Sequence, residues 1–493
     1  MDTSFAVKET QKELKRESRE ESSAERVQAQ QVIRPASLSG YPQLRFQAIS
    51  DASIRIPTAR GQTLRDFTAM SITMVSIIAT ILITALGVLL VANLSLGNKP
   101  IDRHIETLYS VADSQFLRSM GSLLGPSIIE GNRVQALVNG NEIFPAMLKA
   151  IRGAQKTITF ETFIYWSGTI GQEFAEALSE RARAGVRVHV MLDWLGSGDI
   201  DETYVTQMEE AGIEVLRYNP LRWYTLARMN HRTHRKLLVV DGKIGFNGGV
   251  GIAIPWTGNA QDPQHWRDTH FRIEGPVVAQ MQAAFLDNWI EVSGHVLHGA
   301  AYFPPIEPAG THIAQVFTSS PGGGAESAQL MYLLSIAAAK TSVQLSMSYF
   351  VPDNVAVNTF IAARKRGVRI QMLVPGPYID RKLLRRASRF EWGPLLRAGI
   401  EIYEYQPTMF HCKVMVVDEL WTSVGSTNFD SRSFSVNDEA NLNIYDADFA
   451  RIQVRIFEHD LHNSRRITLE EWEDRLWSDK VMDGLAGLFS SQL

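Results

Sequence analysis

Hydrophobic and polar positions divide the first part of the chain into three unlike stretches. Residues 1–66 are polar with mixed charge, which predicts a largely disordered tail. Residues 67–96 carry no charged side chain, and this run predicts one transmembrane helix because about 20 apolar residues span a bilayer core. It is too long for a buried core helix and starts too far from the N-terminus for a signal peptide. Residues 97–130 follow as a mainly helical connector.

Charges on either side of the apolar run favour one orientation. Five arginines between positions 34 and 65 precede the run, with Asp51 and Asp66 to offset them. The far side carries two basic residues beside two acidic ones within positions 99–106. The positive-inside tendency therefore places the tail in the cytoplasm and the large C-terminal region on the outer side.

The rest of the chain repeats an alternation of strand and helix patterns. The sequence AGIEVLRYNP at 211–220 returns as AGIEIYEYQP at 398–407, each after a strand–helix–strand pattern. This pattern predicts a sheet covered by helices, and its long period suits a duplicated domain. We expect an α/β fold with two lobes, at 131–305 and 306–468, related by pseudo-twofold symmetry. An amphipathic helix over 469–493 should follow, and its acidic polar face favours packing against a lobe over membrane contact.

One rare pattern of residues occurs once in each lobe, with identical spacing. Side chains alternate between the faces of a strand, so the histidine and lysine of each copy point to the same side. A histidine can attack phosphorus or carry protons near neutral pH, and a lysine stabilises negative charge on phosphoryl oxygens. Neither role requires a metal. The two copies are His234-x-Lys236-x4-Asp241-x6-Gly248 and His411-x-Lys413-x4-Asp418-x6-Gly425.

Other positions in and around the motifs carry weaker signals. Asp241 and Asp418 belong to the candidate catalytic set, but they follow strand ends, which favours a role in fixing the local loop. Cys412 faces away from the histidine and lysine beside it, which favours a packed residue over a nucleophile. It is the single cysteine, so an intrachain disulfide is impossible. The net charge of −4 argues against a protein that coats nucleic acid.

The paired motifs resemble the phospholipase D superfamily, whose signature is H-x-K-x4-D-x6-G-(G/S)-x-N. The second copy continues as GSTN at 425–428 and matches fully, whereas the first continues as GGVG at 248–251 and lacks the asparagine. Segments 230–236, 265–276 and 428–433 resemble bacterial cardiolipin synthases within that superfamily. The resemblance implies phosphate contacts by Ser426, Asn428 and Gly249.

The resemblance also implies a carboxylate that holds each active histidine in the correct tautomer. Asp268 follows His234 in the first lobe and Glu439 follows His411 in the second, which pairs each acid with the histidine of its own lobe. The two lobes would bring both histidine–lysine pairs into one pocket. His234 would attack the phosphodiester and His411 would act as acid and base, an assignment that the residues alone leave open.

Three functions follow from these features. The first is a phosphatidyltransferase, anchored in a bacterial inner membrane and without a cofactor, that joins two phosphatidylglycerols into cardiolipin and releases glycerol. The second is a phospholipase D or diesterase, which would use the same groups with water as acceptor. The third is an inactive membrane-tethered lipid-binding scaffold, which would predict eroded motifs, yet both histidine–lysine pairs are intact. The sequence carries no signal of oligomeric state.

Three further segments bear on ligand binding. Residues 221–230 interrupt the first lobe with aromatic residues and arginines, and they fit either a lipid interface or a packed loop. Basic residues at 381, 382, 385, 386 and 389 recur at helical spacing, and they fit either a solvated helix face or an anionic headgroup site. His231 and His234 resemble half of a metal site but face opposite ways on a strand, which argues against metal binding.

Overall fold

The computed structural model describes residues 74–88, 105–106, 109–221, 230–321 and 325–488. Residues 74–88 are helical. Within these ranges no helix has both the length and the hydropathy that a membrane crossing requires. The predicted disordered tail, both ends of the predicted transmembrane run and most of the 221–230 segment lie outside the described residues.

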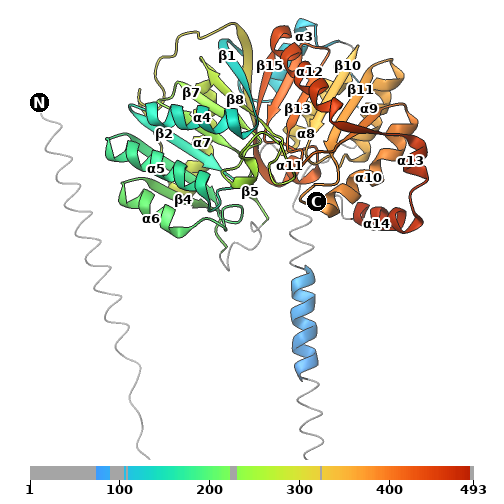
Figure 1. Ribbon diagram of the computed structural model, residues 1–493, viewed down its shortest axis with the longest axis horizontal. Helices are drawn as coiled ribbons and strands as arrows, with labels where there is room; N and C mark the ends of the chain where they lie inside the picture. The colour runs from blue at the N-terminus through green and yellow to red at the C-terminus, as the bar shows by residue number, and fades with distance from the viewer. Residues whose placement is uncertain (1–73, 89–104, 107–108, 222–229, 322–324, 489–493) are drawn as a thin grey trace, which may run out of the picture. The chain divides into compact units, whose positions relative to one another are not determined.

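A sheet of 16 strands, one of them off the main path, runs through both lobes, and the first six strands outward from the centre follow equivalent orders in both directions (Figure 1). At the centre, β1 (Ile129–Val138) pairs antiparallel with β9 (His312–Ser319). Outward from β1 the order is β8 (Thr269–Glu274), β7 (Ile244–Gly248), β6 (Leu237–Val240), β2 (Thr157–Thr162), β3 (Arg187–Asp193) and β4 (Glu214–Tyr218). Outward from β9 it is β15 (Asn437–Tyr445), β14 (Trp421–Gly425), β13 (Lys413–Val417), β10 (Ser342–Met347), β11 (Arg369–Pro375), β12 (Glu401–Tyr405) and β16 (Ser464–Ile467).

Helices cover the sheet at equivalent places in the two lobes, as a duplicated lobe would produce. In the first lobe they are α4 (Asn139–Gly153), α5 (Thr169–Arg183), α6 (Glu202–Glu210) and α7 (Val278–Ser293). In the second they are α8 (Ala325–Ala338), α9 (Asn354–Lys365), α10 (Lys382–Arg397) and α12 (Ala447–His462). A short helix, α11 (Ser431–Ser435), lies just before β15.

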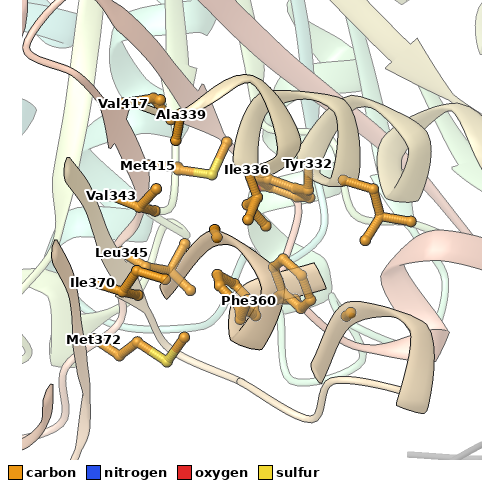
Figure 2. Packing of buried hydrophobic residues seen from close by; sticks show 14 of the residues in the cluster. Tyr332, Ile336, Ala339, Val343, Leu345, Phe360, Ile370, Met372, Met415 and Val417 are labelled. Carbon is orange, nitrogen blue, oxygen red and sulfur yellow. The ribbon is translucent and has the colours of Figure 1, made fainter. Parts of the chain in front are cut away.

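Strand alternation decides which core each side chain joins. In β13, Met415 and Val417 point toward α8 and α9, whereas Val414 and Val416 point toward the core that includes α7 and α12. Figure 2 shows the first of these cores, in which alternate residues of three neighbouring strands meet the two helices. Its labelled members are Tyr332, Ile336, Ala339, Val343, Leu345, Phe360, Ile370, Met372, Met415 and Val417.

Two of the predicted element boundaries differ from the structure. β1 begins at Ile129, inside the predicted connector, and the preceding α3 (Ser114–Leu123) packs on the second lobe, with the rings of Phe116 and Trp421 5.0 Å apart. The C-terminal segment forms two helices, α13 (Leu469–Glu473) and α14 (Trp477–Gly487), where one was expected. The predicted capping box between Thr468 and Glu471 is present at the start of α13.

Candidate active site

The two motifs open into one cavity of about 650 Å³ that is lined by both lobes. His234 lies just before β6, and His411 occupies the equivalent position before β13. Both histidines and Lys236 line the cavity. Lys413 is buried beside it, where its Nζ donates to the Ser348 Oγ at 2.7 Å. The structure therefore brings the two histidine–lysine pairs together, as the repeat predicted.

Each motif strand is joined through its backbone to the opposite lobe. The His234 N–H donates to the carbonyl of Asp438 at 2.8 Å, and the His411 N–H donates to the carbonyl of Arg267 at 2.8 Å. In support of the first contact, β5 (Arg232–Thr233) pairs in parallel with the start of β15. Because Asp438 and Arg267 immediately precede the two candidate carboxylates, each histidine lies beside the acid of the other lobe.

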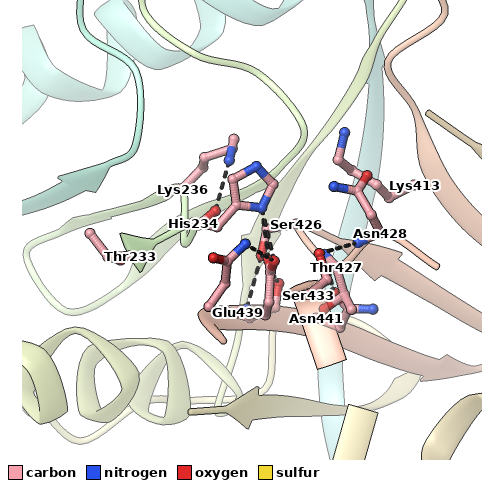
Figure 3. Close-up of polar contacts among 12 residues, drawn as sticks. Thr233, His234, Lys236, Lys413, Ser426, Thr427, Asn428, Ser433, Glu439 and Asn441 are labelled. Carbon is pink, nitrogen blue, oxygen red and sulfur yellow. Dashed lines mark hydrogen bonds and ion pairs between the residues drawn. The ribbon is translucent and has the colours of Figure 1, made fainter. Parts of the chain in front are cut away.

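The orienting carboxylates are therefore exchanged between the lobes, and the predicted pairing within each lobe is wrong. The His234 Nδ1 lies 3.0 Å from the carboxylate oxygens of Glu439 (Figure 3), and the His411 Nδ1 lies 2.8 Å from the Asp268 Oδ2. The imidazole Nδ1–H can donate to the carboxylate in both pairs, which fixes the tautomer with an unprotonated Nε2, and in His411 that Nε2 lies 3.2 Å from the Lys413 Nζ. Neither lobe can form a complete site alone.

Two of the predicted phosphate contacts support the carboxylates instead. The Ser426 Oγ donates to Glu439 at 2.5 Å. Gly249 occupies the equivalent motif position, and a Cβ added there would lie 2.3 Å from the Asp268 Oδ1. Both residues are absent from the cavity lining. In each lobe this motif position thus lies against a carboxylate: Ser426 hydrogen-bonds to Glu439, and the missing side chain of Gly249 leaves room for Asp268.

The third predicted phosphate contact, Asn428, does line the cavity. Its Oδ1 accepts from the Ser348 hydroxyl at 2.6 Å, which leaves the amide group to face a ligand (Figure 3). At the equivalent place in the first lobe, a Cβ on Gly251 would lie 2.8 Å from the Cβ of Ile164. Lobe one also has Phe163 where lobe two has Ser348, and the Phe163 and His234 rings are 5.2 Å apart. The two halves of the site are thus chemically unlike.

The aspartates of the two motifs lie away from the cavity and fix turns. Asp241 and Asp418 both have positive φ, at 53° and 51°. The Asp241 carboxylate accepts the backbone N–H groups of residues 155–157, and Asp418 accepts those of residues 340–342. Each aspartate therefore holds the loop that leads into β2 or β10. Their inclusion in the catalytic set is corrected to this structural role.

Comparisons with known proteins decide the family. The family model described as "Cardiolipin synthase, PLD-like domain" matches residues 147–289 and 332–461. The chain belongs to this family. It is a phospholipase D-type phosphatidyltransferase.

Curated relatives and a solved structure agree with the family assignment. The chain is 33% identical over 365 residues to a cardiolipin synthase of Geobacillus kaustophilus (strain HTA426), which covers 73% of this chain and 72% of the relative. It is 30% identical over 394 residues to cardiolipin synthase 2 of Bacillus anthracis, over 79% and 75% of the two chains. The crystal structure of phosphatidylserine synthase from Haemophilus influenzae Rd KW20 has the same fold, with a TM-score of 0.59 at 13% identity, over 76% of this chain and 99% of that one.

Burial and the lysines shape the electrostatics of the phosphatidyltransferase site. Burial, with Lys236 and Lys413, holds the pKa of His234 well below its ordinary value. Burial and Lys413 also lower the pKa of His411, against an opposing contribution from Asp268. Burial raises the pKa of Asp268, but His411 and Lys413 outweigh it and keep that pKa below its usual value. Asp268 is therefore an ionised carboxylate beside His411 at neutral pH.

The acid beside His234 has a net pKa shift in the opposite direction. Burial raises the pKa of Glu439 above its usual value and lowers the pKa of Lys236, because each charged form loses solvent. The Lys236 Nζ donates to the carbonyl of His234 at 2.7 Å (Figure 3), so the lysine is held close to its own histidine. Around His234, burial and cationic neighbours all disfavour protonation, whereas around His411 the Asp268 carboxylate opposes them.

Aromatic side chains form a wall around His411 that the sequence interpretation missed. Trp256 donates its indole N–H to the Asp268 Oδ2 at 2.9 Å, and its ring lies 5.2 Å from that of His411. Trp266 and Tyr349 complete the wall, with ring distances to His411 of 5.5 and 6.2 Å. The WRD sequence at 266–268 could have indicated Trp266, but no local signal identifies Trp256 as a partner of Asp268.

Adding a methyl group at Gly249 should disable the site without unfolding the protein. In Gly249→Ala, the new Cβ would displace Asp268 from His411, and a shift of about 1 Å costs on the order of 100-fold in rate. Cardiolipin formation by purified protein measures the effect. Gly153→Ala is the matched control, because a Cβ there meets nothing within 4 Å. Equal activity of the two variants would contradict the role given to Gly249.

A buried ion pair joins the lobes behind the site. Arg267 of lobe one donates to both carboxylate oxygens of Asp460 on α12, at 3.0 and 2.7 Å, and both side chains are almost fully buried. Asp460→Ala would leave Arg267 buried without this partner, so we expect a loss of about 3–5 kcal/mol in the free energy of unfolding. Asp448→Ala removes an exposed pair with Arg451 and should cost less than about 1 kcal/mol. Urea denaturation of the two variants would measure both free energies of unfolding. Equal losses of stability would contradict the greater importance given to the buried pair.

The predicted basic stripe divides into two groups with different surroundings. Arg381 and Lys382, at the start of α10, line the cavity. Arg385 pairs with Glu404, and Arg386 pairs with Asp479 and Asp483. The stripe is therefore not a uniform solvated face. Among the described residues, no group of three or more potential ligands could hold a metal ion.

Proposed function

We propose that this enzyme joins two phosphatidylglycerols into cardiolipin and releases glycerol through a phosphatidyl-histidine intermediate. The observation that carries the proposal is the pair of histidines in one cavity, each with Nδ1 on a carboxylate of the other lobe. This arrangement leaves two Nε2 atoms available to act on one phosphorus. The relatives named cardiolipin synthase support this choice of product.

The reaction then takes two displacements at the same phosphorus. In the first, the Nε2 of His234 bonds to phosphorus, the bond from phosphorus to the glycerol headgroup oxygen breaks, and His411 gives its proton to that oxygen. In the second, a hydroxyl of another phosphatidylglycerol loses its proton to His411 and attacks phosphorus, and the P–N bond breaks. Lys236, Lys413 and Asn428 would stabilise the negative charge on the phosphoryl oxygens in both steps.

The electrostatics support this division of labour between the histidines. A nucleophile must be neutral, and the strongly lowered pKa of His234 favours the neutral imidazole. An acid–base group must carry a proton between steps, and the ionised Asp268 stabilises the protonated form of His411. These charges favour His234 as the nucleophile and His411 as the acid and base.

Cationic residues at the cavity favour a lipid acceptor over water. Arg432, Arg381 and Lys382 line the cavity in addition to the motif residues. Arg432 is held by the side chain and carbonyl of Asn230, at 2.8 and 3.2 Å. A second, anionic phosphatidylglycerol would be attracted by the charges beyond those that bind the first phospholipid, whereas water as acceptor would gain nothing from them.

The membrane setting is part of the same proposal. The apolar run at 67–96 would anchor the enzyme in the inner membrane of a bacterium, with the N-terminus in the cytoplasm and the lobes on the outer side. An anchored enzyme would reach a substrate that never leaves the bilayer.

Incubation of the purified protein with phosphatidylglycerol and EDTA, followed by lipid analysis, tests the function. Cardiolipin and glycerol in equal amounts are the expected products. Phosphatidic acid without cardiolipin would indicate the hydrolase instead, and the absence of any turnover would contradict both enzymatic functions.

A further inference from the structure

The C-terminal helix α14 turns its apolar side away from the protein. Trp477, Val481 and Leu485 recur every four residues and are 76%, 45% and 49% exposed, and Leu488, just after the helix, is 76% exposed. A helix that only packs on a domain shows the reverse pattern, with its apolar stripe inward. The described residues leave these side chains uncovered.

Ion pairs hold the opposite, acidic side of α14 against lobe two. Asp483 is buried and lies 3.3 Å from Arg386 of α10 and 2.7 Å from Arg475. Asp479 lies 3.4 Å from the same Arg386. The helix packs against a lobe, as the sequence predicted, but through its charged face. The acids that would repel an anionic surface are thereby paired with arginines.

The exposed side chains continue along α10 toward the cavity. Phe390 of α10 is 46% exposed and lies beside α14, because a Cβ on Gly487 would come within 2.7 Å of its ring. Two turns earlier, Leu383 is 48% exposed and lines the cavity together with Arg381 and Lys382. Figure 1 shows α14 beside α10 on lobe two. The exposed Phe390 and the basic residues of the cavity lining therefore belong to neighbouring parts of one helix.

We propose that this apolar helix face docks on the surface of an anionic phospholipid bilayer and places the cavity entrance against it. The face consists of Phe390, Trp477, Val481, Met482, Leu485 and Leu488. The inference rests on the proposed function, since the substrate would be a membrane lipid. Lipid fits the face better than a protein partner does because the aromatic and aliphatic stripe adjoins α10, at whose start Arg381 and Lys382 line the cavity and would attract anionic headgroups.

A fluorescent label in the full-length protein tests the docking directly. Cys412 is the single native cysteine, it is buried, and burial raises its pKa to about 12, so an introduced thiol reacts selectively near neutral pH. Leu485→Cys would carry an environment-sensitive NBD group in vesicles of phosphatidylglycerol and phosphatidylcholine. Ile452→Cys is the matched control, since Ile452 is 40% exposed on α12, away from the α8–α10 side of the sheet.

The proposal predicts that brominated lipid acyl chains quench the label at position 485 and leave the label at position 452 unquenched. A label at 485 that stays in water would overturn the proposal. A label that is shielded from water but not quenched by lipid would also overturn it and would indicate a protein partner.

Activity gives a second, independent measurement. Val481→Glu combined with Leu485→Glu should lower cardiolipin formation in vesicles by about tenfold, because two apolar side chains lose their transfer from water, and should leave activity in mixed detergent micelles unchanged. Ile452→Glu should change neither. An unchanged rate in vesicles would contradict the docking role. A wild-type protein that makes no cardiolipin in micelles would contradict the proposed function, while the quenching result would still report on docking.

Discussion

The His411→Ala protein is expected to release one equivalent of nitrophenolate from a nitrophenyl ester of phosphatidic acid, whereas the His234→Ala protein should release none. Nitrophenolate leaves without a proton, so the first displacement needs the nucleophile alone. The second displacement needs His411 as base, and the phosphatidyl group would remain on His234. Stopped-flow absorbance would record the burst, and with phosphatidylglycerol both variants should lose about 10⁴-fold or more in rate.

The two alanine variants control for each other because both remove a buried imidazole from the same cavity. A burst from His234→Ala and none from His411→Ala would reverse the assignment of the two roles. Bursts from both variants would mean that neither histidine is required as the nucleophile, which contradicts the proposed mechanism.

The Asp268→Asn protein should lose about 10²–10⁴-fold in cardiolipin formation and show a shifted pH profile. Asp268 raises the pKa of His411, so removing its charge lowers that pKa. The first step needs protonated His411, and this form would then be lost at a lower pH. The alkaline limb of kcat/KM should therefore move to lower pH, which rates measured across the pH range would show.

Glu439→Gln is the comparison that tests the exchange of carboxylates between the lobes. Glu439 contacts His234, so its replacement should reduce the rate and leave the alkaline limb where it is in the parent enzyme. With carboxylates paired inside each lobe, the result would be the reverse, and Glu439→Gln would be the variant that moves the alkaline limb.

Much of the fold was open to prediction because its signals are local and repeated. Short continuous apolar runs such as Val414–Val417 predicted buried strands, and the duplicated motif predicted that both histidine–lysine pairs share a pocket. The family resemblance added Asp268 and Glu439 as carboxylates of the site, and both contact a histidine.

The exchange between lobes could not be predicted because it depends on contacts far apart in the chain. His234 and Glu439 are 205 residues apart, and they meet only because β5 pairs with β15. Likewise, Gly249 and Ser426 occupy the same motif position, which the sequence suggested as a phosphate contact. Only the structure shows that Gly249 lies against Asp268 and that Ser426 donates to Glu439.

The C-terminal segment shows a different limit of sequence reasoning. Its apolar and acidic faces were evident from the periodicity, but periodicity does not say which face meets the protein. Arg386 and Arg475 decide this, since both pair with Asp483 and turn the apolar side outward. The partner charge on α10 lies almost a hundred residues earlier in the chain.

The stereochemical course at phosphorus tests the central claim most directly. Phosphatidylglycerol with a chiral phosphorothioate of known configuration would be converted by the parent enzyme, and the configuration of the resulting cardiolipin would be determined by ³¹P NMR. Two in-line displacements, first by His234 and then by the acceptor hydroxyl, predict overall retention. Inversion would show a single direct displacement and would contradict the phosphatidyl-histidine intermediate.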